Sequence, residues 1–323
     1  MACQKKKDTS IAFYYWKTSL DLQQKDETLL KETSAGKIYL RLFDIRWNEV
    51  KGLALPAGVI KFKQKLPNLA VVPVVYITNK SLSRLGTKGV DSLATNTFRL
   101  LHNIMTNHRI SYEFIQIDCD WTEGTREKYF RYLKRLKLIS KKQLEATIRL
   151  HQVKYKERTG VPPVEKGVLM FYNMGKLNGD LNTPNSIYNK DDASKYTSFI
   201  SSYPLQLDVA LPLFSWLIQV RDSKILGLYS QLTSDELINT GGFSVHPNFL
   251  VAKKSFFFKG IYVKEKDIFK LEETNGEILQ QAAEQLSSAL PQNNKRTIIF
   301  YELGNLNHST FKAKTLNEIS SQF

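Results

Sequence analysis

The chain has 323 residues, 42% of them hydrophobic and 11% aromatic, so it can bury a substantial core as one large domain or two modest ones. Its formal net charge of +15 favours polyanionic partners such as acidic glycans or anionic membranes. The basic residues are scattered rather than blocked, which argues against nucleic acid. The two cysteines, Cys3 and Cys119, are too few for a disulfide framework or a cysteine-rich metal site. No apolar run approaches the roughly 18 residues that a membrane-spanning helix requires.

The first ten residues are predicted to form a polar tether. Met1, Ala2 and Cys3 precede a lysine-rich segment, an order that resembles the start of a mature bacterial lipoprotein, whose cysteine is acylated after a signal peptide is removed. This interpretation predicts lipidation of Cys3 and attachment to a membrane through that lipid alone. Alternatively, Cys3 is an ordinary residue on a disordered terminus.

Eight β-prone segments follow in chain order, most of them separated by helical patterns or by room for helices. The strands are predicted at residues 11–18, 37–47, 69–78, 112–121, 144–153, 167–174, 205–214 and 296–303. The helices are predicted at residues 21–33, 90–107, 125–137, 193–202 and 276–290. Residues 217–273 break the rhythm with a hairpin-like pattern and further β-prone sequence. We therefore predict an α/β (β/α)8 TIM-like barrel as a single domain over residues 11–323, with a β-rich insertion at about 217–273 between the seventh and eighth strands.

The stretch at residues 112–122, YEFIQIDCDWT, carries the strongest functional signal. An apolar strand leads into Asp118 and Asp120 just before a helix, which is typical of the carboxyl edge of an α/β barrel, where such barrels do chemistry. Side chains alternate along a strand, so Gln116, Asp118 and Asp120 are expected on one face. An isolated pair of this kind is more often a turn or cap, but several other predicted strands end similarly.

Carboxylates, amide or imidazole donors and tryptophans gather at the predicted strand ends. Aromatic rings stack on apolar sugar faces, carboxylates and amides bind hydroxyls, and two carboxylates are what glycoside hydrolysis uses. The acid/base candidates are Asp118, Asp120 and Glu302. The candidate substrate-binding residues are Asp44, Trp47, Trp121, Arg149, His151, Gln152, Asp208 and Trp216.

Each of these residues also has a purely structural interpretation. Asp44 can pair with Arg41 or Arg46, Asp208 can be a buried acid satisfied by Arg149 or His151, and the tryptophans can belong to the core. The histidines and acids lack the spacing of a metal site, and no Gly-rich phosphate loop or G-x-S-x-G elbow is present. The sequence therefore predicts neither a metal nor a cofactor.

Four segments together, FIQIDCDWT, ATIRLHQV, GVLMFYNMGKL and LDVALPLFSW, resemble a family of uncharacterised bacterial envelope proteins. The resemblance covers most of residues 11–305. It implies a glycoside-hydrolase-like barrel and an envelope location, since many Bacteroidetes members are lipoproteins. It carries no catalytic assignment.

Two hypotheses about function remain open. In the first, a glycoside-hydrolase-like barrel of the bacterial envelope acts on or binds a glycan through a pocket of carboxylates and tryptophans at the carboxyl end. In the second, the protein is a non-catalytic carbohydrate-binding or scaffolding lipoprotein. A weaker third idea is that its basic surface docks on acidic polysaccharide or lipid headgroups.

Overall fold

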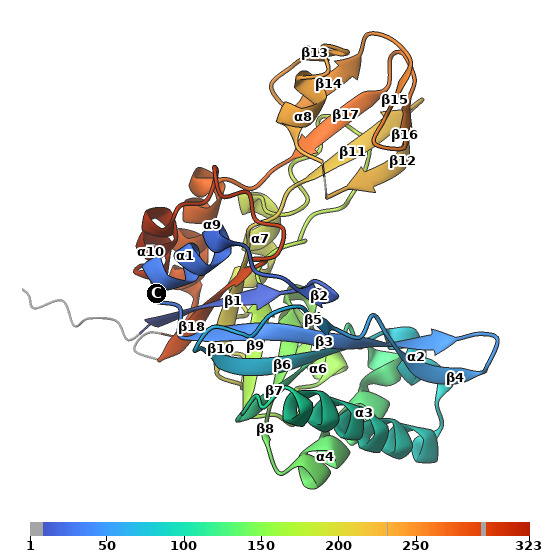
Figure 1. Ribbon diagram of the computed structural model, residues 1–323, viewed down its shortest axis with the longest axis vertical. Coiled ribbons are helices and arrows are strands. Elements are labelled where there is room, and N and C mark those ends of the chain that lie inside the picture. Colours follow the sequence, from blue (N-terminus) through green and yellow to red (C-terminus); the bar gives the residue numbers. More distant parts are fainter. Residues whose placement is uncertain (1–8, 231, 292–294) are drawn as a thin grey trace, which may run out of the picture.

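The protein, described by a computed structural model over residues 9–230, 232–291 and 295–323, consists of a barrel with a second lobe projecting from one end (Figure 1). The barrel strands are all parallel, and β1 pairs with both β3 and β18, which closes the ring. The predicted eight-stranded α/β barrel is therefore confirmed. In chain order its strands are β1 (Thr9–Tyr15), β3 (Lys37–Asn48), β6 (Ala70–Ile77), β7 (Phe114–Asp118), β8 (Gln143–Arg149), β9 (Lys166–Met170), β10 (Leu207–Pro212) and β18 (Arg296–Tyr301).

Helices pack around the outside of the barrel because each turns an apolar stripe toward the strands. In α3, for example, Val90, Leu93, Leu101 and Met105 recur at helical spacing and are buried. The helices are α1 (Gln24–Glu32), α2 (Asn79–Arg84), α3 (Thr87–Asn107), α4 (Arg126–Ser140), α5 (Leu150–Lys154), α6 (Lys156–Thr159), α7 (Lys190–Thr197), α9 (Gly276–Ala289) and α10 (Ala313–Ser320), with the 3-10 turn η1 (Glu123–Thr125) before α4.

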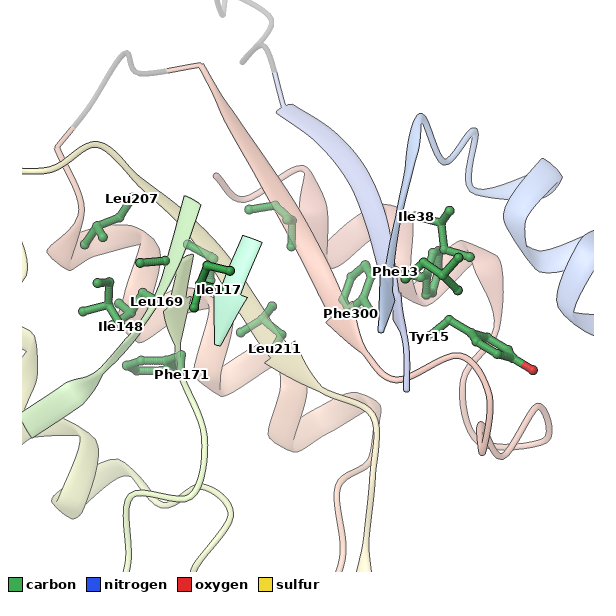
Figure 2. Close-up of a cluster of buried hydrophobic side chains, with 14 of the residues drawn as sticks. Phe13, Tyr15, Ile38, Ile117, Ile148, Leu169, Phe171, Leu207, Leu211 and Phe300 are labelled. Atoms are coloured by element: carbon green, nitrogen blue, oxygen red, sulfur yellow. The ribbon is translucent and has the colours of Figure 1, made fainter. Parts of the chain in front are cut away.

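The two faces of the strands bury different residues. Figure 2 shows outward-facing side chains such as Ile117, Ile148 and Leu211 in the large cluster between strands and helices. A smaller cluster, including Tyr14 and Tyr39, fills the inside of the barrel. On β7, Ile117 therefore faces outward, as the alternation predicts, and the intervening polar residues face the interior.

The predicted fifth strand is wrong at its end. We expected it to run through residue 153, but β8 stops at Arg149 and α5 begins at Leu150. The side chain of Gln152 causes the change, since its Oε1 atom accepts a hydrogen bond of 2.8 Å from the backbone N–H of Arg149 and caps the new helix. His151 and Gln152 therefore leave the strand edge.

The insertion between the seventh and eighth barrel strands is confirmed as a β-rich unit. It forms an antiparallel sheet in the order β12-β11-β17-β14-β13, called here the inserted sheet, and it has a core of its own that includes Leu217, Leu250 and Phe269. Its elements are β11 (Trp216–Arg221), β12 (Lys224–Tyr229), α8 (Ser234–Ile238), β13 (Phe243–Val245), β14 (Phe249–Ala252), the hairpin β15 (Phe256–Phe258) and β16 (Ile261–Val263), and β17 (Ile268–Glu272).

Three short strands complete the fold. The strand β4 (Leu53–Ala57) pairs with the end of β3 as an antiparallel arm, and β2 (Ser19–Leu20) pairs with β5 (Lys61–Phe62). Cys3, the predicted lipidation site, lies outside the described residues. None of the helices in the described ranges is long and apolar enough to cross a membrane.

Candidate functional site

Asp118 stands at the carboxyl end of β7 and is buried. Its Oδ1 atom accepts a hydrogen bond of 2.6 Å from the hydroxyl of Thr147 on the neighbouring strand β8. Burial raises the pKa of Asp118 to about 6, although the positive charge of Arg149 opposes this shift. Asp118 can therefore hold a proton close to neutral pH.

Asp120, two residues further along, is paired with Arg149 at the end of β8. The guanidinium donates from Nε to Oδ1 at 2.5 Å and from Nη2 to Oδ2 at 3.2 Å, a two-point contact. Burial by itself would lower the pKa of Arg149, but Asp120 and Asp118 outweigh it and raise that pKa. Two of the predicted site residues, Asp120 and Arg149, thus neutralise each other at the mouth.

A chain of polar contacts runs from the mouth into the barrel. The hydroxyl of Tyr14 donates to Oε1 of Gln116 at 2.6 Å, and Nε2 of Gln116 donates to Oε2 of Glu145 at 3.3 Å. Burial raises the pKa of Glu145 to about 7, and the charge of Asp208 adds to the shift. The sequence analysis missed Glu145 because it lies inside an apolar strand rather than at a strand end.

Aromatic side chains form a continuous cluster at the mouth, centred on Tyr301 at the end of β18, and Tyr14 is its fully buried member. The ring centroids of Tyr14, Trp16 and Tyr172 each lie 5.6 Å from that of Tyr301, and Phe214 bridges Tyr301 to Trp216 at 5.8 and 5.2 Å. We call these six residues the aromatic platform: Tyr14, Trp16, Tyr172, Phe214, Trp216 and Tyr301. The signal that was overlooked is that each lies at or just beyond the carboxyl end of a barrel strand.

The four tryptophans divide between three environments. Trp16 and Trp216 belong to the platform, but Trp121 is fully buried in the outer core, where it stacks on Tyr129 at 4.9 Å and donates its indole N–H to the carbonyl of Thr159 at 2.8 Å. Trp47 lies on the arm formed by β3 and β4 and donates to Glu49 at 3.1 Å. The expected substrate-binding role of Trp121 is therefore corrected to a core role, because an enclosed ring cannot touch a ligand.

Asp44 takes the structural role that the sequence left open. Its Oδ1 atom accepts from Nε of Arg41 at 2.7 Å, and its Oδ2 atom accepts from Nη2 of Arg46 at 2.8 Å. Both possible partners therefore bind it, and its carboxylate is occupied within the protein.

Asp208 lies away from the other predicted residues. It is the second residue of β10, at the amino end of the barrel, where it accepts from the backbone N–H of Thr297 at 2.8 Å and lies 3.4 Å from Nζ of Lys166. It is indeed a buried acid, but Thr297 and Lys166 satisfy it instead of Arg149 or His151.

His151 and Gln152 lie on α5 rather than on a strand. His151 is exposed overall, and partial desolvation of its imidazole lowers its pKa, although the charge of Asp120 opposes this shift. Gln152 is buried and donates to the carbonyl of Trp121 at 3.1 Å, so both ends of its amide are used within the fold. Within the described chain, neither residue forms a hydrogen bond, an ion pair or a ring contact with the platform.

Glu302 directly follows β18 and is largely buried at the mouth. Its carboxylate accepts hydrogen bonds from the backbone N–H of Trp16 at 2.9 Å and from Nδ2 of Asn305 at 2.5 Å. Burial raises the pKa of Glu302, and these two hydrogen bonds oppose the shift. The side chain of Lys17 fills the space beside Gly304, with its Cγ atom 3.1 Å from where a Cβ atom on that glycine would stand.

A cavity of about 570 Å³ opens between the barrel mouth, the inserted sheet and the segment that follows β18. Phe214, Trp216, Tyr301 and Glu302 form its barrel side. Its other polar lining residues are Asn173, Ser215, Ser230, Thr233, Ser234, Asp235, Glu273, Thr274, Asn275, Asn305, Asn307 and Thr310. The cavity therefore has three platform rings, Phe214, Trp216 and Tyr301, on one side and a wall rich in amides and hydroxyls on the other.

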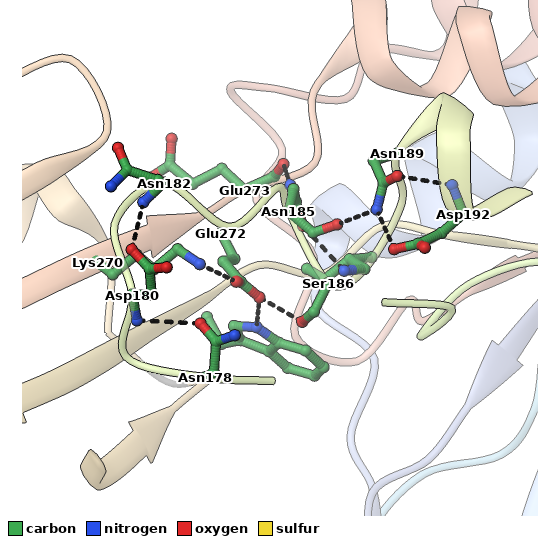
Figure 3. A network of polar contacts seen from close by, with 12 residues as sticks. Asn178, Asp180, Asn182, Asn185, Ser186, Asn189, Asp192, Lys270, Glu272 and Glu273 are labelled. Atoms are coloured by element: carbon green, nitrogen blue, oxygen red, sulfur yellow. Dashed lines mark hydrogen bonds and ion pairs between the residues drawn. The ribbon is translucent and has the colours of Figure 1, made fainter. Parts of the chain in front are cut away.

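A buried polar network fixes the inserted sheet to the barrel (Figure 3). Oε2 of Glu272 accepts from the indole N–H of Trp216 at 2.8 Å and from the hydroxyl of Ser186 on the loop before α7. Nζ of Lys270 lies 3.0 Å from Oε1 of Glu272, and both side chains are buried. Asn185 adds a hydrogen bond of 2.8 Å to the carbonyl of Glu273. The network thereby holds Trp216 at the edge of the cavity.

The part of the chain that the structure describes contains no group of three or more His, Cys, Asp or Glu side chains arranged to hold a metal ion.

The fold of the chain is similar to that of several solved TIM-barrel proteins. The spore cortex-lytic enzyme SleL of Bacillus cereus is 12% identical, with a TM-score of 0.56 over 98% of this chain and 75% of that enzyme. A GH18 chitinase of Cycas revoluta in complex with (GlcNAc)3 is 11% identical, with a TM-score of 0.55 over 97% of this chain and 98% of the chitinase. A chitinase of Rhizomucor miehei is 10% identical, with a TM-score of 0.54 over 96% and 99% of the two chains.

No protein-family model and no curated protein sequence matches the chain. At 10–12% identity the similarity to solved structures establishes the fold alone, which is a (β/α)8 TIM barrel with an insertion.

Proposed function

We propose that the protein binds a glycan in the cavity at the barrel mouth. The observation that carries this proposal is the composition of the cavity wall, in which the rings of Phe214, Trp216 and Tyr301 are surrounded by amide and hydroxyl side chains. Apolar sugar faces stack on such rings, and sugar hydroxyls need directed hydrogen-bonding partners. The volume of about 570 Å³ also falls in the usual range of ligand pockets.

The similar structures support the same class of ligand. Two of them are chitinases, and the Cycas revoluta enzyme is in complex with (GlcNAc)3. A soluble oligomer of N-acetylglucosamine is therefore the first glycan to test.

Removal of the platform rings should weaken glycan binding. Trp216→Ala and Tyr301→Ala are each expected to lower the affinity for N-acetylglucosamine tetramer by roughly tenfold or more, because each takes away a stacking surface in the cavity. Isothermal titration calorimetry measures this change. Trp47→Ala is the matched control, since Trp47 lies on the β3–β4 arm and should leave the affinity unchanged. Equal affinities in all three variants and the parent would argue against the cavity as the binding site.

Hydrolysis of a glycan at the barrel mouth is a second candidate function, favoured by the raised pKa of Asp118, although Glu302 lines the cavity and Asp118 does not. Glycosidic cleavage requires one carboxyl group that can donate a proton, and burial raises the pKa of Asp118 to about 6. Asp120 is less suited because Arg149 stabilises its anion. Glu302, the third predicted acid/base residue, is a further carboxyl group at the mouth with a raised pKa. A non-catalytic carbohydrate-binding role corresponds to the same site without turnover.

We also propose that the protein is held at the bacterial envelope by a lipid on Cys3. This proposal rests on the resemblance of residues 1–8 to the start of a mature lipoprotein. When the chain is produced in a bacterium behind a lipoprotein signal peptide, mass spectrometry should find acyl chains on Cys3, and Cys3→Ser should release the protein from the membrane fraction. An unmodified Cys3 in such cells would overturn the assignment.

A further inference from the structure

The wall of the mouth cavity has a charge opposite to that of the whole protein. The chain carries a formal net charge of +15, yet among its described residues no lysine or arginine lines the cavity. Three of them are acids: Asp235 at the start of α8, Glu273 after β17 and Glu302 after β18. The three acids come from separate elements, two on the insertion side and one on the barrel side, so they surround the space instead of clustering on one loop.

Most buried or partly buried acids elsewhere in the described chain are paired with cations. Asp44 binds Arg41 and Arg46, Asp120 binds Arg149, and Asp267 binds Arg221. The cavity acids differ, because among the described residues no lysine or arginine forms an ion pair with any of them. Of the three, Glu302 feels the positive charges of Lys17 and Arg41, which lower its pKa against the larger effect of burial. Glu273 instead accepts a hydrogen bond of 2.8 Å from the hydroxyl of Ser234, and Glu302 accepts its hydrogen bonds from neutral N–H groups.

Asp235 and Glu273, which form no ion pair within the described chain, produce a negative potential in this partly enclosed space. An acidic sugar would lose its hydration in this space and meet like charge without a guanidinium or ammonium group to bind it. A protonated amine would instead be attracted to this space, since the carboxylates can accept its hydrogen bonds and balance its charge. The positive net charge of the whole chain therefore does not predict the charge of the ligand that the cavity binds.

We infer that the cavity selects a glycan built from hexosamines with free amino groups, binds the N-acetylated form less tightly, and excludes acidic glycans. This inference rests on the proposed glycan-binding function and specifies its substrate class.

The test compares three tetrasaccharides of similar size by isothermal titration calorimetry on the full chain: glucosamine tetramer, N-acetylglucosamine tetramer and galacturonate tetramer. At a pH where the amines are protonated, we expect the glucosamine tetramer to bind roughly fivefold or more tighter than the N-acetylated one, and the galacturonate tetramer not to bind. The preference should shrink as sodium chloride is added, because salt screens charges.

Two variants show whether the carboxylates cause the preference. Glu273→Gln keeps the acceptor for Ser234 but removes the charge, so it should lower the affinity for glucosamine tetramer roughly fivefold and leave that for N-acetylglucosamine tetramer unchanged. Glu265→Gln is the matched control, since Glu265 is exposed on the inserted unit and does not line the cavity. A change that is equal for both sugars would overturn the charge argument.

The outcomes separate this inference from the proposed function. Equal or tighter binding of N-acetylglucosamine or galacturonate tetramer would overturn the inference and leave glycan binding intact. Failure of all three tetramers to bind would overturn both.

Discussion

Replacing Lys270 by Met is expected to lower the free energy of unfolding by about 3–5 kcal/mol. The substitution leaves the Glu272 carboxylate buried in β17 without the ammonium group that lies 3.0 Å from it. A hydrogen bond from Trp216 and another from Ser186 remain, but neither carries a positive charge. The cost of burying an unpaired charge is therefore only partly offset.

Urea unfolding at neutral pH measures this effect. Lys264→Met is the matched control, because Lys264 is exposed near the same sheet, and it should change stability by no more than about 0.5 kcal/mol. Adding Glu272→Gln to Lys270→Met removes the stranded charge and should restore part of the loss. If the single variant were as stable as the control, the Lys270–Glu272 ion pair would not stabilise the inserted sheet.

Asp118→Asn should stabilise the protein at pH 8 by about 2 kcal/mol, with the gain disappearing below pH 4. Burial raises the pKa of Asp118 from 3.8 to about 6, so the folded protein binds this proton more tightly than the unfolded chain does. The stability contributed by this group is therefore largest at low pH and falls as pH rises from about 4 to 6. Asparagine has no charge to bury and can still accept the hydrogen bond from Thr147.

Urea unfolding of the parent protein and of Asp118→Asn at pH 4 and pH 8 measures how the free energy of unfolding changes with pH. The exposed Glu265→Gln is the control. A gain of the same size at both pH values would show that it does not come from the titration of Asp118.

The same variant tests the second candidate function. If Asp118 donates the proton in hydrolysis, Asp118→Asn should lower turnover of a chitooligosaccharide at least roughly 100-fold while the oligomer still binds.

The barrel could be predicted from the sequence because its signals are local. Apolar runs separated by helical patterns indicate parallel strands wherever they occur, and the alternation around Asp118 on β7 follows from strand geometry alone. The interruption at residues 217–273 was visible for the same reason, since hairpin patterns differ in period from helices. Strand ends were less certain: one side-chain cap from Gln152 turned the end of the predicted fifth strand into α5.

The candidate site depended on contacts between residues far apart in the chain, which no local pattern reports. Arg149 reaches Asp120 from 29 residues away, and the Glu272 carboxylate reaches Trp216 across 56. Trp121 became a core residue because its ring packs under Tyr129, and Asp208 faces the amino end because of its place within β10. The sequence by itself determined the barrel, the insertion and the acids of β7. Only the tertiary structure decided which acids are paired and which face the cavity, because pairing and exposure depend on how separate elements meet in space.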